Sequence, residues 1–149
     1  MDKISKEARS RNMAAIKHKD TEPELVIRRG LHALGLRYRI HKKNLPGKPD
    51  LYFAKYKTAV FIHGCFWHQH KDCSNAVMPK TNRDFWMNKL NGNVNRDQSN
   101  ISKLSNSGIK VVVVWECTIV EHMRAKKIDN LIEGIHQILI EKGNGVYEF

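Results

Sequence analysis

The sequence has no long hydrophobic run. No segment approaches the ~18 consecutive apolar residues that a membrane-spanning helix requires. The first residues, Met1-Asp2-Lys3, are not followed by the apolar core of a secretory signal peptide. We therefore expect a cytoplasmic protein without a membrane partner. Internal repeats, linkers and low-complexity tracts are also missing, so the 149 residues are expected to form a single domain.

Acidic residues are few relative to basic ones. The chain contains 26 Lys and Arg against 15 Asp and Glu, which gives a formal net charge of +11. A field of this sign attracts polyanions, and nucleic acid is the usual one. We expect residues 1–20 to form a basic arm that clamps phosphates, with residues 21–149 as the globular domain. A frayed terminus is the alternative interpretation of the arm.

The spacing of apolar residues predicts helices and strands in alternation. Thr21-Glu22-Pro23-Glu24 fits a capping box, and the helix that it begins is expected to end at Gly35. The β-branched run KVVVVW predicts a strand that is covered on both faces. In all, strands are expected at residues 36–40, 50–54, 58–63 and 110–115. Further helices are expected at about 81–105, with an interruption near Gly92, and at about 123–141. This order predicts an α/β fold in which helices flank a mixed sheet.

The three cysteines occur in a pattern typical of metal binding. Residues 63–73, HGCFWHQHKDC, contain two of them together with three histidines, and the third follows the predicted buried strand. An odd number of cysteines in a reducing compartment argues against a disulfide framework. A Cys₃His set would complete the tetrahedron of a structural zinc site and attach this loop to the sheet. Its members would be Cys65, His70, Cys73 and Cys117. The alternatives are three buried thiols with surface histidines, or a catalytic zinc with an open position.

A second candidate site begins at Asp50. Phosphodiester hydrolysis requires a hard divalent cation on oxygen ligands, and a proline–aspartate turn at the start of a strand can supply a carboxylate. His63 and His68 flank the cysteine loop and are not needed by a zinc ion. A rigid loop could hold both as acid–base or phosphate-contacting groups near Asp50. Taken singly, Asp50 also fits a turn residue, and each histidine fits a surface residue.

Taken together, these residues resemble the very short patch repair endonuclease family, mismatch-nicking enzymes related to restriction endonucleases. The matching segments occur in the family's order across most of residues 9–117. They are RSRNM (9–13), LPGKPD (45–50), HGCFWH (63–68), FW (85–86), NVNRD (93–97) and WEC (115–117). The resemblance implies a restriction-endonuclease-like fold for residues 21–149, magnesium-dependent catalysis and a structural zinc. It also implies a nick 5′ of the T in a T·G mismatch, which arises by deamination of 5-methylcytosine. A monomer on double-stranded DNA, with downstream repair proteins as further partners, is expected on the same ground.

The resemblance also implies roles for individual residues. Asp50 would bind Mg²⁺ together with the backbone carbonyl of Ile62, and His68 would act as the general acid–base. The residues that support this site would be His63, Glu24 and Asp97. Zinc would be held by Cys65, His70, Cys73 and Cys117. DNA would be contacted by Arg9, Arg11, Asn12 and Met13 in the arm and by the aromatic wedge Phe66, Trp67 and Trp86.

Two positions depart from the family's pattern. Ile62 stands where threonine is usual, which retains the backbone carbonyl and loses the hydroxyl. Lys71-Asp72 makes the zinc loop one residue longer than the commonest pattern, so His68 or Asp72 remains an alternative to His70 as the fourth ligand.

The aromatic wedge has a physical rationale. A mismatch is detected by how easily a base step unstacks, which costs a few kcal/mol per step and less where pairing is poor. Core packing is the alternative for each wedge residue, although neighbours such as Phe66 and Trp67 cannot easily both face a core. Two other functions remain open: a related nuclease without mismatch preference, and a non-catalytic, zinc-stabilised DNA-binding module.

Overall fold

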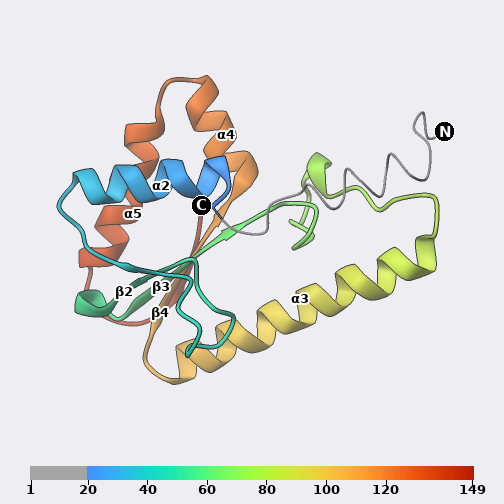
Figure 1. The fold of residues 1–149 in the computed structure, drawn as a ribbon, viewed down its shortest axis with the longest axis horizontal. Helices are drawn as coiled ribbons and strands as arrows, with labels where there is room; N and C mark the ends of the chain where they lie inside the picture. Colours follow the sequence, from blue (N-terminus) through green and yellow to red (C-terminus); the bar gives the residue numbers. More distant parts are fainter. Residues whose placement is uncertain (1–19) are drawn as a thin grey trace.

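A mixed sheet of five strands lies at the centre of residues 20–149, the part of the chain that this computed structural model describes (Figure 1). The strands are β1 (Arg39–Ile40), β2 (Leu51–Phe53), β3 (Thr58–His63), β4 (Lys110–Trp115) and β5 (Val146–Glu148). They lie side by side in chain order: β1, β2 and β3 pair antiparallel, and β3, β4 and β5 pair parallel. The predicted mixed α/β sheet is confirmed. The expected DNA contacts at Arg9, Arg11, Asn12 and Met13 lie outside the described residues.

Helices cover both faces of this sheet. They are α2 (Glu22–Ala33), α3 (Arg83–Asn106), α4 (Glu116–Arg124) and α5 (Ile128–Ile140), with short 3₁₀ turns at Ala54–Tyr56 and Ser74–Ala76. In Figure 1, α3 lies on one side of the strands, and α2, α4 and α5 gather on the other. α3 connects β3 to β4, and α4 with α5 connects β4 to β5, so each parallel pair has the helical crossover that it needs. Within residues 20–149, no helix has the length and apolar character required to cross a bilayer.

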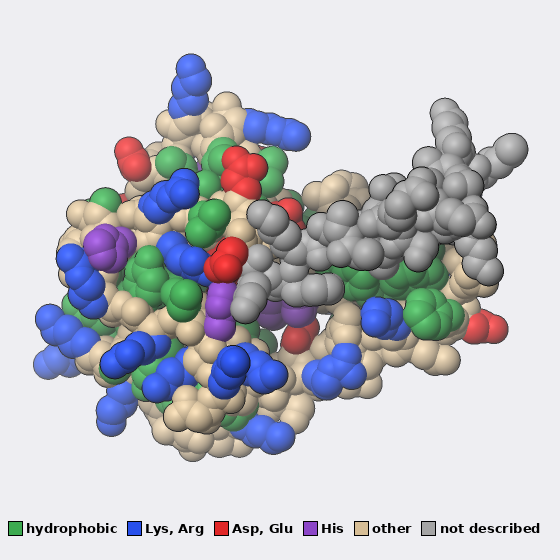
Figure 2. All heavy atoms as spheres, in the orientation of Figure 1, with side chains coloured by type: hydrophobic (Ala, Val, Ile, Leu, Met, Phe, Trp, Pro, Cys, Tyr) green, Lys and Arg blue, Asp and Glu red, His purple; other side chains and the backbone are tan. Residues whose placement is uncertain are grey.

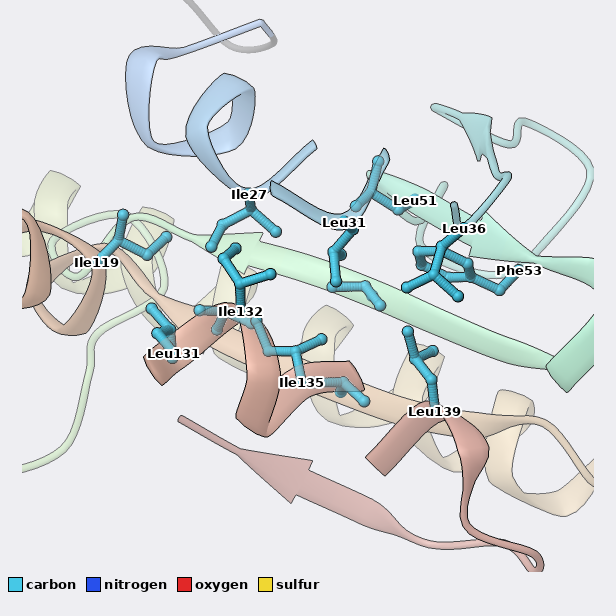
Figure 3. Close-up of a cluster of buried hydrophobic side chains, with 13 residues drawn as sticks. Ile27, Leu31, Leu36, Leu51, Phe53, Ile119, Leu131, Ile132, Ile135 and Leu139 are labelled. Atoms are coloured by element: carbon cyan, nitrogen blue, oxygen red, sulfur yellow. The ribbon is translucent and has the colours of Figure 1, made fainter. Parts of the chain in front are cut away.

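Successive side chains of the central strands point to opposite faces of the sheet, and this divides the core into two clusters. Val60 packs against α2 and α5 through residues such as Ile27 and Ile135, which are fully buried (Figure 3). Phe61, the next residue of β3, packs on the opposite face against Leu104 of α3. Because successive side chains in a strand point to opposite faces, both faces of β3 and β4 must be apolar, as the run KVVVVW predicted.

Several elements differ from the predictions. The strand expected at 36–40 is reduced to β1, because Leu36 is buried in the core cluster beneath α2 rather than in a ladder. α3 continues through Gly92 without interruption, since the tertiary contacts of the helix outweigh the weak propensity of one glycine. The helix expected at 123–141 begins later, as α5, and α4, which lies almost wholly before that range and ends near Lys126 with its left-handed φ of +56°, was not predicted. β5 was not predicted at all.

Candidate functional site

The candidate residues converge at one edge of the sheet because of strand direction. β3 and β4 are parallel, with His63 in register with Trp115, so both strands end at this edge. Cys65 lies two residues beyond the end of β3, and Cys117 lies two residues beyond the end of β4. β2 runs antiparallel to β3, so Asp50, which immediately precedes β2, lies at the same edge. Three segments that are distant in sequence thereby meet in one place.

Asp50 is held against β3 by its own carboxylate. Its Oδ2 accepts a hydrogen bond of 2.7 Å from the backbone N–H of Ile62. Within a strand, the N–H and C=O of one residue point to the same side, so the Ile62 carbonyl also faces the side of Asp50. The pKa of Asp50 is raised to about 6, mainly by burial and with a smaller contribution from the charge of Glu24, while the Ile62 hydrogen bond opposes the rise. An acid that burial and a neighbouring acid discourage from ionising will gain from a bound cation.

An open cleft of about 530 Å³ lies over this carboxylate. Its lining comes from α2, the start of β2, the end of β3, the loop that follows and the start of α4. The residues are Thr21, Glu22, Pro23, Glu24, Asp50, Ile62, Gly64, Trp67, His68 and Glu116. A second hollow of about 460 Å³ shares Trp67 and His68 and continues along α3, where Lys89 and Arg96 add positive charge. The two hollows together give room and charge for a phosphate backbone on either side of His68.

His68 is oriented by a partner on α3. Its Nδ1 lies 2.6 Å from Oδ2 of Asp97, and its ring stacks on that of His63 at 3.9 Å between centroids. His63 is 5% exposed, and burial followed by the neighbouring His68 lowers its pKa to about 3. His63 is therefore neutral at physiological pH and supports His68 by packing. The predicted trio of His63, His68 and Asp97 is brought together.

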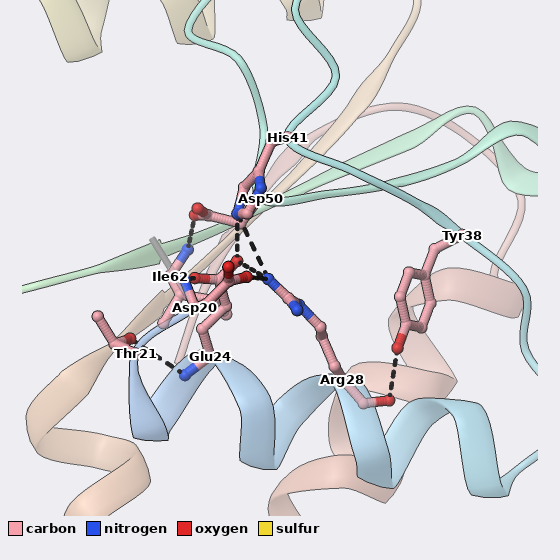
Figure 4. Close-up of polar contacts among 8 residues, drawn as sticks. All are labelled: Asp20, Thr21, Glu24, Arg28, Tyr38, His41, Asp50 and Ile62. Atoms are coloured by element: carbon pink, nitrogen blue, oxygen red, sulfur yellow. Dashed lines mark hydrogen bonds and ion pairs between the residues drawn. The ribbon is translucent and has the colours of Figure 1, made fainter. Parts of the chain in front are cut away.

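Glu24 joins the cleft from α2 (Figure 4). The Thr21 hydroxyl accepts a hydrogen bond of 3.4 Å from the Glu24 N–H, as the predicted capping box requires. The Glu24 carboxylate, however, accepts from the N–H of Asp20 at 2.8 Å and not from that of Thr21. Its other partners are Arg28 and His41. Glu24 as a residue is 2% exposed, so α2 places a buried carboxylate at the cleft wall.

The three cysteines and His70 form a separate cluster beside the cleft. The four candidate ligand atoms of Cys65, His70, Cys73 and Cys117 all lie within 4.8 Å of one another. Nδ1 of His70 lies 3.6 Å from Sγ of Cys65 and 3.4 Å from Sγ of Cys117. A tetrahedral zinc with ordinary Zn–S and Zn–N bonds separates such atoms by about 3.6 Å, so the spacing fits this ion. Neither alternative ligand, His68 or Asp72, belongs to the cluster.

Burial and crowding make this cluster unfavourable for thiolates in the absence of a cation. The pKa of Cys65 is raised to about 12, first by burial and then by the neighbouring cysteines, against a hydrogen bond from the Cys117 backbone. A cation is what would allow several thiolates to coexist here. The ring of His70 stacks on Trp115 at 4.1 Å, and Trp115 also contacts His63 edge-on at 5.2 Å. Trp115 thus connects the cysteine cluster to the histidines of the cleft.

The predicted wedge residues form one aromatic cluster. Ring centroids are 5.1 Å apart for Phe66 and Trp67, 5.6 Å for Phe66 and Trp86, and 6.0 Å for Trp67 and Trp86. All three are partly exposed, and Phe85 beside them is 59% exposed, so core packing does not explain the group. The Asn93 amide donates a 3.0 Å hydrogen bond to the Trp67 carbonyl and fixes the loop to α3.

Two residues that contact Glu24 were missed from the sequence. Arg28 follows Glu24 by one helical turn, and this i,i+4 spacing is a signal that could have identified the pair. His41 comes from a basic segment after β1, where nothing in the spacing points to Glu24.

The face of the molecule that Figure 2 shows is basic: Lys and Arg side chains clearly outnumber Asp and Glu side chains on it.

Comparison with known proteins identifies the family. The model of the family described as DNA mismatch endonuclease Vsr matches residues 1–75. Type II nicking enzyme V.NmeAIP of Neisseria meningitidis is 48% identical over 111 residues, which cover 74% of this chain and 79% of that protein. V.XorIIP of Xanthomonas oryzae is 41% identical over 118 residues, covering 79% and 86%. DNA mismatch endonuclease Vsr of Escherichia coli is also 41% identical over 118 residues, covering 79% and 75%. The chain belongs to the Vsr family of DNA mismatch endonucleases.

Proposed function

We propose that this mismatch endonuclease nicks one strand 5′ of the T in T·G mismatches, with Mg²⁺ at Asp50 and a structural Zn²⁺ in the cysteine cluster. Such mismatches arise when 5-methylcytosine deaminates. One observation carries the proposal: Asp50 and His68 line the same cleft. The Asp50 carboxylate is held by the Ile62 N–H, and the His68 imidazole is held by Asp97. These are the metal-ligating and proton-transferring groups that phosphodiester hydrolysis requires.

Asp50 and the Ile62 carbonyl would hold the magnesium ion. Both offer oxygen, the ligand that this cation prefers. When bound, the ion would neutralise charge on the phosphate and make water more acidic. The Ile62 N–H keeps Asp50 oriented, and replacing threonine by isoleucine leaves both backbone groups in place. Glu24 and Asp50 would share the cleft as the acidic half of the site.

His68 would move the proton. Because Asp97 can only accept, Nδ1 of His68 carries a hydrogen toward it, which leaves Nε2 to take up or release a proton in the cleft. His63, stacked on the same ring and neutral, would keep His68 from rotating without competing for the proton.

The zinc ion would have a structural role. Four protein ligands, Cys65, His70, Cys73 and Cys117, leave no open position for substrate. The ion would fix the loop that carries both His68 and the wedge residues Phe66 and Trp67, and Trp86 would complete the wedge from α3. The arm residues Arg9, Arg11, Asn12 and Met13 would contact double-stranded DNA, with the protein acting as a monomer ahead of downstream repair proteins.

A nicking assay on labelled duplexes tests the proposal. We expect a single-strand cut 5′ of T in T·G duplexes, dependent on Mg²⁺ and abolished by EDTA, and a much slower cut in matched duplexes. Asp50→Ala should abolish nicking while DNA binding and folding persist. Equal cutting of matched duplexes would identify a nuclease without mismatch preference, and binding without any cut would identify a DNA-binding module. Varied flanking bases in the same panel would give the sequence context.

A further inference from the structure

The Glu24 carboxylate is surrounded by hydrogen-bond donors. Oε2 accepts from the Asp20 N–H at 2.8 Å, and Oε1 accepts from Arg28 Nη2 at 2.8 Å and from His41 Nε2 at 2.7 Å (Figure 4). Arg28 Nη2 also bonds Asp20 and lies 3.4 Å from His41 Nε2. Asp20, Glu24 and His41 have the spacing of a metal site, but the guanidinium of Arg28 already provides the cation at this place.

This arrangement limits what Glu24 can do in the cleft. A carboxylate has about four acceptor positions, two on each oxygen. Both positions of Oε1 are used by side chains, and one of Oε2 is used by the backbone. With the contacts made by residues 20–149, one acceptor position on Oε2 therefore remains. Glu24 can accept a single further hydrogen bond in the cleft, and its direction is determined by the donors that hold the other three positions.

His41 also contacts the other acid of the site. Its backbone N–H donates to the carbonyl of Asp50 at 3.0 Å, and the next residue pairs likewise, Lys42 N–H to Pro49 carbonyl at 3.2 Å. His41 adopts a left-handed φ of +47°, an uncommon conformation for a residue with a side chain. Such strain persists where the surroundings determine the conformation, and it concentrates at functional sites. One residue thus holds Glu24 with its ring and Asp50 with its backbone.

We propose that His41 is a positioning residue for strand cleavage, which fixes the Glu24 carboxylate relative to Asp50 while Arg28 offsets its charge. This inference rests on the proposed magnesium-dependent nicking at Asp50. A carboxylate only accepts, so Nε2 of His41 carries the hydrogen that points to Glu24. The purely structural alternative is that the contact merely attaches α2 to the segment after β1.

Replacement of His41 by glycine separates these two roles. Glycine adopts φ +47° without strain, so His41→Gly removes the ring and keeps the backbone link to Asp50. We expect the single-turnover nicking rate at saturating DNA to fall about 10- to 100-fold, as is usual when a residue supporting a metal site is removed. The Kd for the T·G duplex and the melting temperature should stay close to those of the wild type. His41→Gln, which retains an N–H donor, should recover part of the rate.

A matched control is available at Lys57. This residue has the same φ of +47°, is exposed and lies at the opposite end of β3 from the cleft, so Lys57→Gly makes the same backbone change without touching Glu24. Its nicking rate should equal that of the wild type. A double-mutant cycle completes the test: if His41 acts through Glu24, His41→Gly should cause no further loss in a Glu24→Gln background.

Each outcome is decisive. A wild-type rate for His41→Gly would overturn the proposal, as would a loss that is additive with Glu24→Gln or that follows a fall in melting temperature. A wild-type protein that does not nick at all would overturn the proposed function, and the positioning role with it. Rate loss with intact binding, partial recovery by glutamine and non-additivity would together support the proposal.

Discussion

His68 and Asp97 are joined by a contact of 2.6 Å between Nδ1 and Oδ2, although 29 positions separate them in the chain. His68 lies in the loop after β3, and Asp97 lies in the middle of α3, which extends well beyond the sheet (Figure 1). The contact therefore depends on how α3 crosses the sheet. It fixes which nitrogen of His68 can exchange a proton in the cleft.

Asp97→Asn should slow nicking about 10- to 100-fold without weakening DNA binding. The amide keeps the size of the side chain but can donate as well as accept, so it no longer fixes which nitrogen of His68 carries the hydrogen. Single-turnover rates and duplex Kd values measure the two effects separately. Asp84→Asn, an exposed acid in the first turn of the same helix, is the matched control and should be silent. Unchanged nicking by Asp97→Asn would remove Asp97 from the mechanism.

The pH dependence of nicking should respond to magnesium. The pKa of Asp50 is raised from 3.8 to about 6 in the metal-free protein, so the carboxylate becomes ionised as pH rises through this value. A bound cation favours the ionised form and lowers the apparent pKa. The acidic limb of the pH–rate profile should therefore move to lower pH as Mg²⁺ is increased. A limb whose midpoint does not depend on Mg²⁺ would argue against Asp50 as a ligand.

The sequence predicted which segments would meet at this edge of the sheet better than it predicted the elements around them. The ligand groups follow strands with strong patterns, and parallel strand ends share an edge, so the loop at 63–73 and Cys117 had to meet. β5 has three residues, of which Val146 is 48% exposed, and so small a strand has no periodicity to detect. The break between α4 and α5 depends on the left-handed conformation of Lys126. A lysine in the sequence does not predict this conformation, whereas a glycine would.

The polar environment of Glu24 shows the other limit of sequence reasoning. Arg28 is one helical turn from Glu24, and local geometry makes the pair predictable. His41 reaches the same carboxylate from 17 positions away, after the chain has left α2 and entered the sheet. Its position depends on the register of β1 with β2, which two residues per strand define. Tertiary structure alone supplies this contact.

Zinc removal should unfold the loop after β3. We expect one zinc per chain by elemental analysis, and a lower melting temperature on chelation because metal binding contributes to folding. His70→Gln and Cys117→Ser should lose the metal, whereas His68→Gln should keep it and lose nicking. His32→Gln, at an exposed histidine of α2, is the control for histidine replacement in general. Zinc retained by His70→Gln and lost by His68→Gln would reverse the ligand assignment.

Trp67→Ala should reduce the preference for mismatched over matched duplexes. Its ring belongs to the exposed aromatic cluster with Phe66 and Trp86, and its backbone is fixed independently through Asn93. Removing the ring should therefore leave the loop in place while weakening insertion beside the mismatch, which exploits the low cost of unstacking there. The measurement is the ratio of nicking rates on T·G and T·A duplexes of equal sequence. An unchanged ratio would assign the cluster to packing.

Ile62→Thr should leave the nicking rate within about twofold of the wild type. A tenfold change in rate would require a change of ~1.4 kcal/mol in the activation free energy, and the expected effect is smaller than that. The groups of Ile62 that face Asp50 belong to the backbone, and its side chain packs on the other side against the core cluster of α2 and α5. Threonine restores a hydroxyl at the cost of some apolar contact, so a small fall in melting temperature is expected. Ile62→Val, which shortens the side chain without adding a polar group, is the control. A tenfold gain in rate for Ile62→Thr at equal stability would show that the hydroxyl contributes to cleavage and that isoleucine weakens this site.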